Sequence, residues 1–186
     1  MKFLIRDAFL IAIENEFGRL HRISKSNSLF TVRDKVRLYV RYSKLHPRGS
    51  TFFGLRQEDL ALLEGFPSFI AFLWDGQREP LLVPYEQFAL VFRSVGPASD
   101  GQYKVHIYSN GEGTDLHIVR AGRFGVDSYF GLTELRRAIL GGEDYSLPVE
   151  FSHHQIQSVM GAIGKLTGHA VYIPLNDRPV LDWDIV

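Results

Sequence analysis

An alternating stretch at residues 36–56, VRLYVRYSKLHPRGSTFFGLR, constrains the fold more than any other part of the chain. Apolar residues occupy every second position from 36 to 42, which indicates a β-strand with one buried face. The other face carries, in order, Arg37, Tyr39, Arg41 and Ser43. A strand gains no stability from two arginines on an open face. We therefore predict that this face holds an anion.

The charge of the chain is unevenly distributed. Between residues 33 and 56 there are seven lysines or arginines and one aspartate, a net charge of +6, whereas the whole chain has a formal net charge of +0. The remainder must then carry −6. Such a polarised protein would turn one face toward a nucleic acid and repel it from the others.

We predict that the basic strand and loop, 37–56, bind double-stranded DNA, because Lys and Arg contacts to phosphate dominate affinity for a duplex. Phosphate contacts would position the duplex, and a side chain that reaches a groove would read its bases. The alternative is a solvated strand face with acidic neighbours such as Glu58 and Asp59. The predicted DNA-binding residues are Arg37, Arg41, Ser43, Lys44, His46, Arg48, Arg56 and Arg123.

A pocket for a modified base is a further hypothesis. Aromatic residues lie beside the basic loop and further along the chain, and aromatic rings can stack on a base that has left a duplex. The alternative is that these rings are part of the core. The candidate residues are Phe52, Phe53, Trp74 and Tyr129.

The pattern along the rest of the chain predicts an α+β fold, with a mixed, β-rich sheet or pseudobarrel and several short helices. Predicted helices are 2–17, 55–64, 85–92 and 133–140. Predicted strands are 29–32, 36–43, 68–74, 80–83, 103–108 and 116–120. The run SFIAFLW at 68–74 is apolar throughout, which predicts a strand covered on both faces. Residues 47–54, with Pro and Gly, and 121–131, which are rich in Gly, are predicted to be irregular.

Several classes of chemistry are disfavoured by composition. With Cys 0, the chain has no disulfide framework and no thiolate. His153 and His154 are adjacent, so on a helix they would point about 100° apart and could not easily share a metal ion. No Gly-rich phosphate loop is present. We predict no cofactor, no metal, no membrane partner and a cytoplasmic location, since no apolar run spans a bilayer and no secretory signal is evident.

Two stretches resemble a known family. HHQIQSVMGAIGKLTGHAVYIPLNDR at 153–178 resembles the opening helix and strand of a restriction-endonuclease-type nuclease domain. The residues that fit this pattern are Ile156, Gln157, Gly164, Gly168, Asn176, Asp177 and Arg178. Residues 41–88 resemble an N-terminal recognition domain attached to such nucleases, which implies a β-rich pseudobarrel. In that family the catalytic acids and lysine come further along, and this chain stops at Val186 without them. The resemblance therefore implies no catalytic residues and no catalysis by this chain alone.

The sequence thus predicts a recognition domain at 1–145, followed by the incomplete start of a nuclease domain at 150–186. The predicted function is a DNA-recognition module of a restriction or defence system. A homodimer is an open alternative to a monomer. One alternative is a small or degenerate PD-(D/E)XK-type nuclease that would use Asp34, Lys44 and a further acid, although Tyr42 stands where such a core carries an acid. The other is a protein-interaction module whose polarised surface meets an acidic partner.

Overall fold

The computed structural model describes residues 2–23, 26–46, 49–110 and 113–141, which belong to one compact unit. The α-helices are α1 (Lys2–Phe17), α2 (Gln57–Ala61), α3 (Tyr85–Val95) and α4 (Thr133–Leu140). The strands are β1 (Leu20–Arg22), β2 (Leu29–Val32), β3 (Val36–Ser43), β4 (Ser50–Arg56), β5 (Ser68–Trp74), β6 (Leu81–Pro84), β7 (Gln102–Asn110), β8 (Gly113–Ile118) and β9 (Gly122–Gly125). This confirms the predicted α+β fold. The predicted nuclease segment, 150–186, lies outside the described residues.

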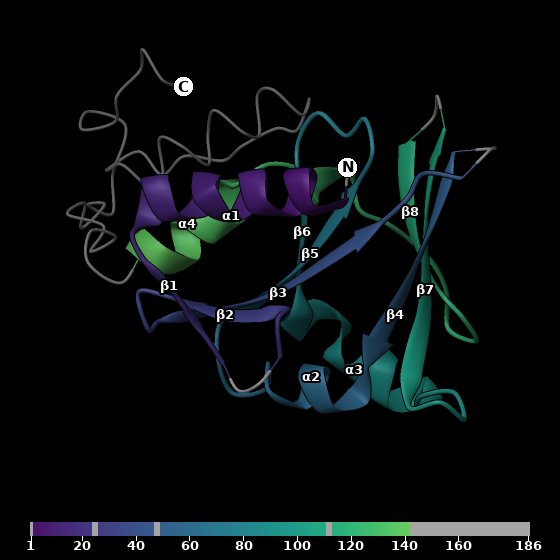
Figure 1. Cartoon of the computed structure of the whole chain (residues 1–186). Helices are drawn as coiled ribbons and strands as arrows, with labels where there is room; N and C mark the ends of the chain where they lie inside the picture. The colour runs from purple at the N-terminus through teal and green to yellow at the C-terminus, as the bar shows by residue number, and fades with distance from the viewer. Residues whose placement is uncertain (1, 24–25, 47–48, 111–112, 142–186) are drawn as a thin grey trace, which may run out of the picture. The chain divides into compact units, whose positions relative to one another are not determined.

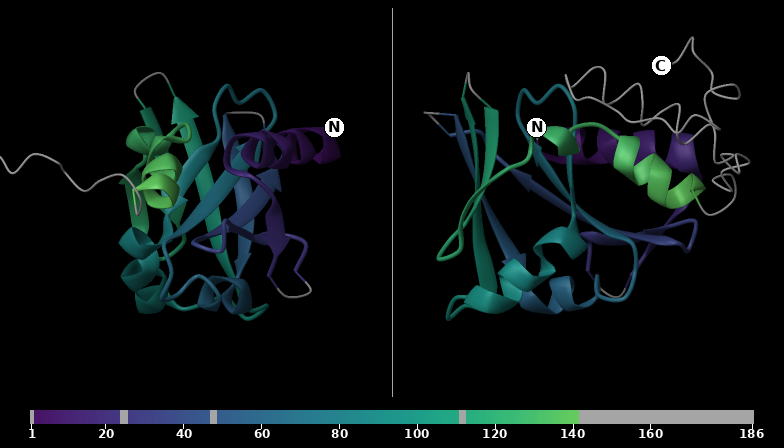
Figure 2. Two further views of the ribbon diagram at one scale, coloured as in Figure 1. Left: turned by 90° about the vertical axis from the view of Figure 1, so that its left-hand side faces the viewer. Right: turned by 180° about the vertical axis from the view of Figure 1, so that it is seen from behind.

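The strands form two sheets rather than a closed barrel. The first sheet has the order β1-β2-β3-β5-β6 and is mixed, because β3 and β5 run parallel while its other pairs are antiparallel. The second sheet, β4-β7-β8-β9, is antiparallel throughout. Figure 1 shows α1 and α4 on one face of the first sheet, and Figure 2 shows the same arrangement from two other sides. Helices α2 and α3 close one end of the space between the sheets (Figure 1).

Two apolar clusters hold these layers together. One fills the space between the two sheets and includes Phe53 and Phe72, whereas the other lies between the first sheet and helices α1 and α4. Strand β5 separates the clusters, and all seven of its residues are buried. Ile70 and Phe72 belong to the first cluster, while Phe69 and Leu73 belong to the second. The prediction that 68–74 is covered on both faces is therefore confirmed.

The basic strand β3 forms a hairpin with β2, as predicted, but its arginine face is not open. Arg33 and Asp34 adopt positive φ angles of 50° and 55° in the turn, which the N–H of Lys35 closes by donating to the Val32 carbonyl at 3.1 Å. On the arginine face, Tyr39 is 0% exposed. Strand β3 is central in its sheet, and the second sheet packs over this face. The prediction of a half-buried strand was wrong for that reason.

The segment that precedes α2 is a strand, not the predicted loop. Strand β4 pairs with β7, with Thr51 opposite Ile107 and Phe53 opposite Val105. Its alternate side chains point into the core, so Thr51 and Phe53 are buried while Phe52 is exposed. Gly54 was read as a loop signal, but here it lies within a paired strand. Residues 122–125 are likewise a short edge strand within the Gly-rich segment that the sequence predicts to be irregular, and residues 20–22 form a short edge strand of the first sheet.

Among the helices of the described residues, none has the length and apolar character needed to cross a membrane.

Candidate nucleic-acid interface

The predicted DNA-binding residue Arg37 is engaged within the protein. Its Nη1 donates to the carbonyl of Leu62, and its guanidinium carbon lies 3.3 Å from the centre of the Phe66 ring. Both contacts come from the segment that links α2 to β5. Arg37 thus fastens this link to β3, and little of its guanidinium faces solvent for a ligand.

Ser43 is likewise committed to the fold. It is 8% exposed, and its hydroxyl oxygen accepts the backbone N–H of Phe52 at 3.2 Å. The same hydroxyl donates to the Lys44 carbonyl at 3.1 Å. This pair of bonds ties the end of β3 to β4, so Ser43 has no hydrogen left to offer a phosphate.

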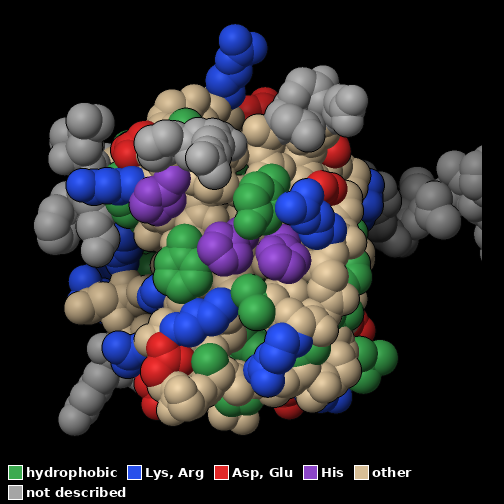
Figure 3. All heavy atoms as spheres, turned by 90° about the vertical axis from the view of Figure 1, so that its right-hand side faces the viewer, with side chains coloured by type: hydrophobic (Ala, Val, Ile, Leu, Met, Phe, Trp, Pro, Cys, Tyr) green, Lys and Arg blue, Asp and Glu red, His purple; other side chains and the backbone are tan. Residues whose placement is uncertain are grey.

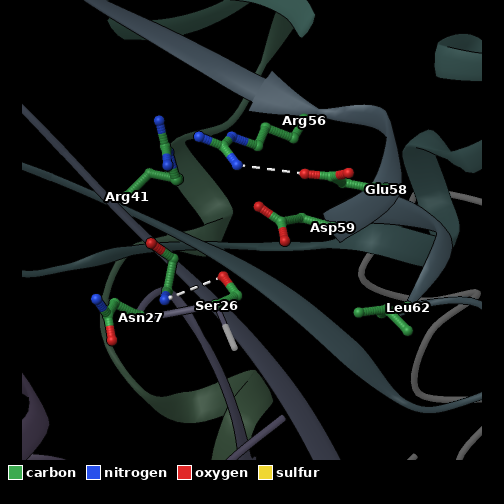
Figure 4. A pocket seen from close by; sticks show the side chains of 8 residues that line it. Ser26, Asn27, Arg41, Arg56, Glu58, Asp59 and Leu62 are labelled. Carbon is green, nitrogen blue, oxygen red and sulfur yellow. Dashed lines mark hydrogen bonds and ion pairs between the residues drawn. The ribbon is translucent and has the colours of Figure 1, made fainter. Parts of the chain in front are cut away.

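Arg41, by contrast, lines a concavity. Its guanidinium carbon lies 5.5 Å from the Tyr39 ring centre, and its Nε is buried with no hydrogen-bond partner among the described residues. Figure 4 shows Arg41 and Arg56 on one side of this concavity, with Asp59 beside them. Arg56 is already paired with Glu58, at 3.2 Å between Nη1 and Oε1. Arg41 and Arg56 therefore come together, but acids share their surroundings.

The other predicted residues lie elsewhere. Lys44 and His46 are exposed in the connection between β3 and β4. Arg48 lies outside the described residues. Arg123 is exposed on β9, at the edge of the second sheet. The structure thus distributes the predicted set over three surroundings instead of one ridge along β3.

Arg123 belongs to a row of side chains that crosses all four strands of the second sheet. Register pairs Phe52 of β4 with His106 of β7, His106 with His117 of β8, and His117 with Arg123 of β9. In the neighbouring row, Tyr108 of β7 lies beside this series. These side chains alternate with the inward, buried residues of each strand, so they share the outer face of the sheet. Figure 3 shows histidines gathered at its centre, with hydrophobic and basic side chains around them.

The rings of this outer face contact one another. The Phe52 and His106 ring centres are 5.1 Å apart, and those of His106 and His117 are 5.9 Å apart. The Tyr108 ring is 5.9 Å from His106 and 6.0 Å from His117. Phe52 is 42% exposed. Four rings from three strands therefore form a continuous aromatic surface, which we call the ring platform.

Cations flank the ring platform on both sides. The Arg123 guanidinium carbon lies 4.5 Å from the Tyr108 ring centre, and the Lys104 ammonium lies 5.9 Å from that of Phe52. Lys104 is also paired with Asp100, and Asp115 stands opposite Tyr108 on β8. Cations beside π-systems are held by the ring quadrupole. The platform therefore offers both positive charge and ring surface to a ligand.

Burial lowers the pKa of the His106 imidazole below its ordinary value. The positive charges of His117 and His46 add to this effect, while a hydrogen bond with the Thr51 backbone opposes it. The lowered pKa favours the neutral form of the His106 imidazole in the free protein. An anionic ligand on the platform would favour its charged form instead.

The aromatic residues predicted to form a modified-base pocket do not meet. Phe53 packs in the core against Phe72, with ring centres 4.9 Å apart, and Trp74 packs against Phe130. Tyr129 lies against Phe88, while Phe52 belongs to the ring platform. Phe53 and Trp74 are buried in the cluster between the sheets, and Tyr129 packs against that cluster, so these rings belong to the core rather than to an open cage for a base.

The predicted nuclease residues Asp34 and Lys44 lie at opposite ends of β3. Asp34 is in the turn before this strand and Lys44 follows its last residue, so the eight residues of β3 separate them. At about 3.3 Å per residue, the distance is roughly 26 Å. The two side chains cannot serve one metal ion. Within the described ranges, no group of three or more His, Asp or Glu side chains is placed to hold a metal.

The sequence analysis missed most of the ring platform. A local signal existed, since Lys104, His106 and Tyr108 alternate with apolar residues in a predicted strand. Phe52, however, lies in the stretch 47–54 that the sequence predicts to be irregular, and the pairing of His117 with His106 joins two strands whose register the sequence does not give. A search for aromatic and basic residues on the outward face of each strand would have found three members of the set.

No protein-family model matches the chain, and no curated protein or solved structure is significantly similar to it.

Proposed function

We propose that this unit binds nucleic acid, and that unpaired bases stack on the ring platform of the second sheet. The observation that carries the proposal is the row of Phe52, His106, His117 and Arg123 across four paired strands. Aromatic side chains on an open sheet offer stacking surfaces to successive bases, and flanking cations follow the backbone. Lys104 and Arg123 supply these cations.

Single strands fit this surface better than a duplex does. A base presents its face only when it is unpaired, whereas a duplex presents phosphates and groove edges. The described part of the second sheet offers rings over its centre and two cations at its sides, so its chemistry matches exposed bases. The duplex predicted for the basic strand lacks comparable support, because Arg37 and Ser43 are engaged in the fold.

Titration of the full chain with fluorescent oligonucleotides tests this function. We expect a mixed-sequence single strand of twelve nucleotides to bind at least tenfold more tightly than the corresponding duplex at 50 mM salt. With two phosphate contacts, affinity for a single strand should fall roughly sevenfold between 50 and 200 mM salt. Equal or tighter binding of the duplex would contradict the proposal and favour the basic strand.

The biological setting remains the one that the sequence predicts. We propose that the unit serves as the recognition part of a restriction or defence protein, and the support for this setting is the resemblance at 41–88 and 153–178. A recognition part that contacts unpaired bases would act on opened or single-stranded DNA. A duplex with a central unpaired bubble, added to the titration, would measure this preference directly.

The affinity should depend on pH through His106. Its pKa is lowered in the free protein and would be raised by a bound polyanion, so binding is coupled to proton uptake. Affinity should therefore rise as the pH falls from 7.5 and level off below the lowered pKa of the free imidazole. Each pKa unit of difference between the two states corresponds to about a tenfold change.

The control for this effect is His106→Asn, measured by the same titration at pH 7.5 and 5.5. It should lose part of the pH dependence of binding. The stability of the free protein should change with pH in the opposite direction to the affinity, so it should fall as the pH falls. Because the folded-state pKa of His106 is lowered, its contribution to stability is lost as the pH falls below about 6.5. A pH dependence that His106→Asn leaves unchanged would argue against this role.

A further inference from the structure

A second concavity lies on the far side of Arg41 and is lined by three arginines. Its volume is about 480 Å³, and its walls include Arg6 of α1, Arg22 of β1 and Arg41 of β3, together with Asn27 and Ser28. These arginines are far apart in the chain, and the packing of α1 and the hairpin strands against one another brings them to one place. No acidic side chain is among the described residues that line it. We call this concavity the arginine pocket.

The arginine pocket is built from fixed parts. Asn27 accepts hydrogen bonds from both Arg6 and Arg22, through its backbone carbonyl and its side-chain oxygen respectively, and the latter bond is 3.0 Å. The carbonyl of Ser28 accepts the N–H of Val40 at 2.7 Å, which holds the loop against β3. Two of the three guanidinium groups are thus positioned before any ligand arrives. Preorganised donors lose less entropy on binding.

Arg41 is the member of the pocket that lacks a protein acceptor. Its Nε is buried and makes no hydrogen bond to the described residues, and burying an unpaired donor is costly. Two acids that contact lining residues of the pocket have other partners or positions. Asp75 accepts the hydroxyl of Tyr42 at 2.8 Å, and Asp7 lies 3.4 Å from Nη1 of Arg6. An anion in the pocket would accept hydrogen bonds from the guanidinium of Arg41, which lines it.

We propose that the arginine pocket binds one phosphate monoester group. A guanidinium group can form a planar, bidentate pair of hydrogen bonds with two phosphate oxygens. Three guanidinium groups therefore suit a doubly charged phosphate with three terminal oxygens. The volume exceeds that of inorganic phosphate alone, so the pocket also admits the organic group next to it. The choice of organic group rests on the proposed nucleic-acid binding, which makes the ligand class a mononucleotide or the phosphorylated end of a strand.

The adjoining concavity limits the ligand to a single phosphate. It has a volume of about 640 Å³, shares Arg41, Asn27 and Ser28 with the arginine pocket, and is also lined by Glu58 and Asp59 (Figure 4). Asp59 is 6% exposed, and burial together with the Asp59 carboxylate raises the pKa of Tyr39 to about 12, against the opposing effect of Arg41. Arg56 also lines this concavity, but it is paired with Glu58. A second phosphate would therefore meet the Asp59 carboxylate and, among the described residues, no arginine that is still free of an acidic partner except Arg41, which already contacts the first phosphate. Hydroxyl or amino groups of a ligand would find acceptors there.

Calorimetric titration of the full chain at constant ionic strength tests the phosphate site. Adenosine 5′-monophosphate should bind, adenosine should not, and adenosine 5′-triphosphate should bind at least tenfold more weakly than the monophosphate. Tighter binding of the triphosphate, or equal binding of adenosine, would overturn the proposal, since either result would show that the pocket does not select one phosphate.

Substitutions of single arginines test whether the monophosphate binds in the arginine pocket. Arg41→Gln should weaken binding of the monophosphate at least tenfold, whereas Arg93→Gln, which changes an exposed arginine on α3 paired with Glu64, should leave it unchanged. Should circular dichroism show that Arg41→Gln does not fold, Arg22→Gln is the deciding variant, because Arg22 is exposed. Wild-type affinity in the folded variant would overturn the site.

Two further arms identify the source of the phosphate and separate this site from the ring platform. A hexanucleotide with a 5′-phosphate that binds more tightly than the same strand with a 5′-hydroxyl would assign the pocket to strand ends, whereas equal binding would assign it to free mononucleotides. A Phe52→Ala/Tyr108→Ala variant should keep wild-type affinity for the monophosphate. A result that contradicts binding at the ring platform would then not contradict phosphate binding in the arginine pocket, and the reverse also holds.

Discussion

Replacing Phe52 and Tyr108 together with alanine is expected to weaken binding of single-stranded nucleic acid about 100-fold. Loss of one base–ring stack costs about 1–3 kcal/mol, and the two side chains lie at different places on the ring platform. Tyr108 also supports the Arg123 guanidinium, 4.5 Å from its ring centre, so its removal frees a cation as well. Fluorescence anisotropy with a twelve-nucleotide single strand at 50 mM salt measures the change.

The matched control removes two exposed apolar side chains from other surfaces. Phe66 and Leu90 are 46% and 73% exposed, and neither belongs to the second sheet. A Phe66→Ala/Leu90→Ala variant should bind the single strand with wild-type affinity. If both double variants lose affinity equally, or if neither does, the ring platform is not the binding surface. Thermal melts of each variant show whether the fold is intact.

Replacing Phe72 with alanine is expected to destabilise the unit by about 3–5 kcal/mol, the usual cost of deleting a buried aromatic ring. Phe72 is 0% exposed on β5, and its ring meets Phe53 of β4 edge-on at 4.9 Å. This contact joins the first sheet to the second. Domains of this size are commonly stable by only about 5–15 kcal/mol, so much of the stability should be lost. Urea unfolding followed by circular dichroism measures the free energy.

Leu90→Ala is the control for this experiment, because an exposed leucine on α3 should change stability by less than about 0.5 kcal/mol. A cost below about 1 kcal/mol for Phe72→Ala would show that the two sheets are not packed through this ring. Where Phe72→Ala remains folded at low temperature, its affinity for nucleic acid should match that of the wild type. The substitution removes core contacts and leaves the outer face of the second sheet in place.

The helices and strands that the sequence predicted correctly are those specified by residue patterns within a short stretch of chain. The hairpin of β2 and β3 follows from alternating residues on both sides of a short turn, and β5 follows from seven successive apolar residues. Helix α1 follows from its apolar spacing. Each of these patterns lies within about twenty residues, so neighbouring side chains are enough to specify it.

The ring platform could not be predicted in the same way, because distant pairings assemble it. Phe52 and His106 are neighbours through the pairing of β4 with β7, and Arg123 joins them through β8 and β9. Packing between distant segments also determines which side chains on the arginine face of β3 are buried. The sequence around β3 does not indicate that the second sheet covers Tyr39, or that the Arg37 guanidinium packs on the Phe66 ring. Tertiary packing decided which charged residues remain accessible.

The hydrogen bond between Ser43 and the amide of Phe52 has a mechanical consequence. Phe52 points its ring outward from the second sheet while its backbone is fastened to the end of a strand in the first. The two layers cannot slide past each other at this point without breaking that bond. The stacking surface is therefore anchored to the deeper layer, and it would keep its shape while the surrounding loops rearrange.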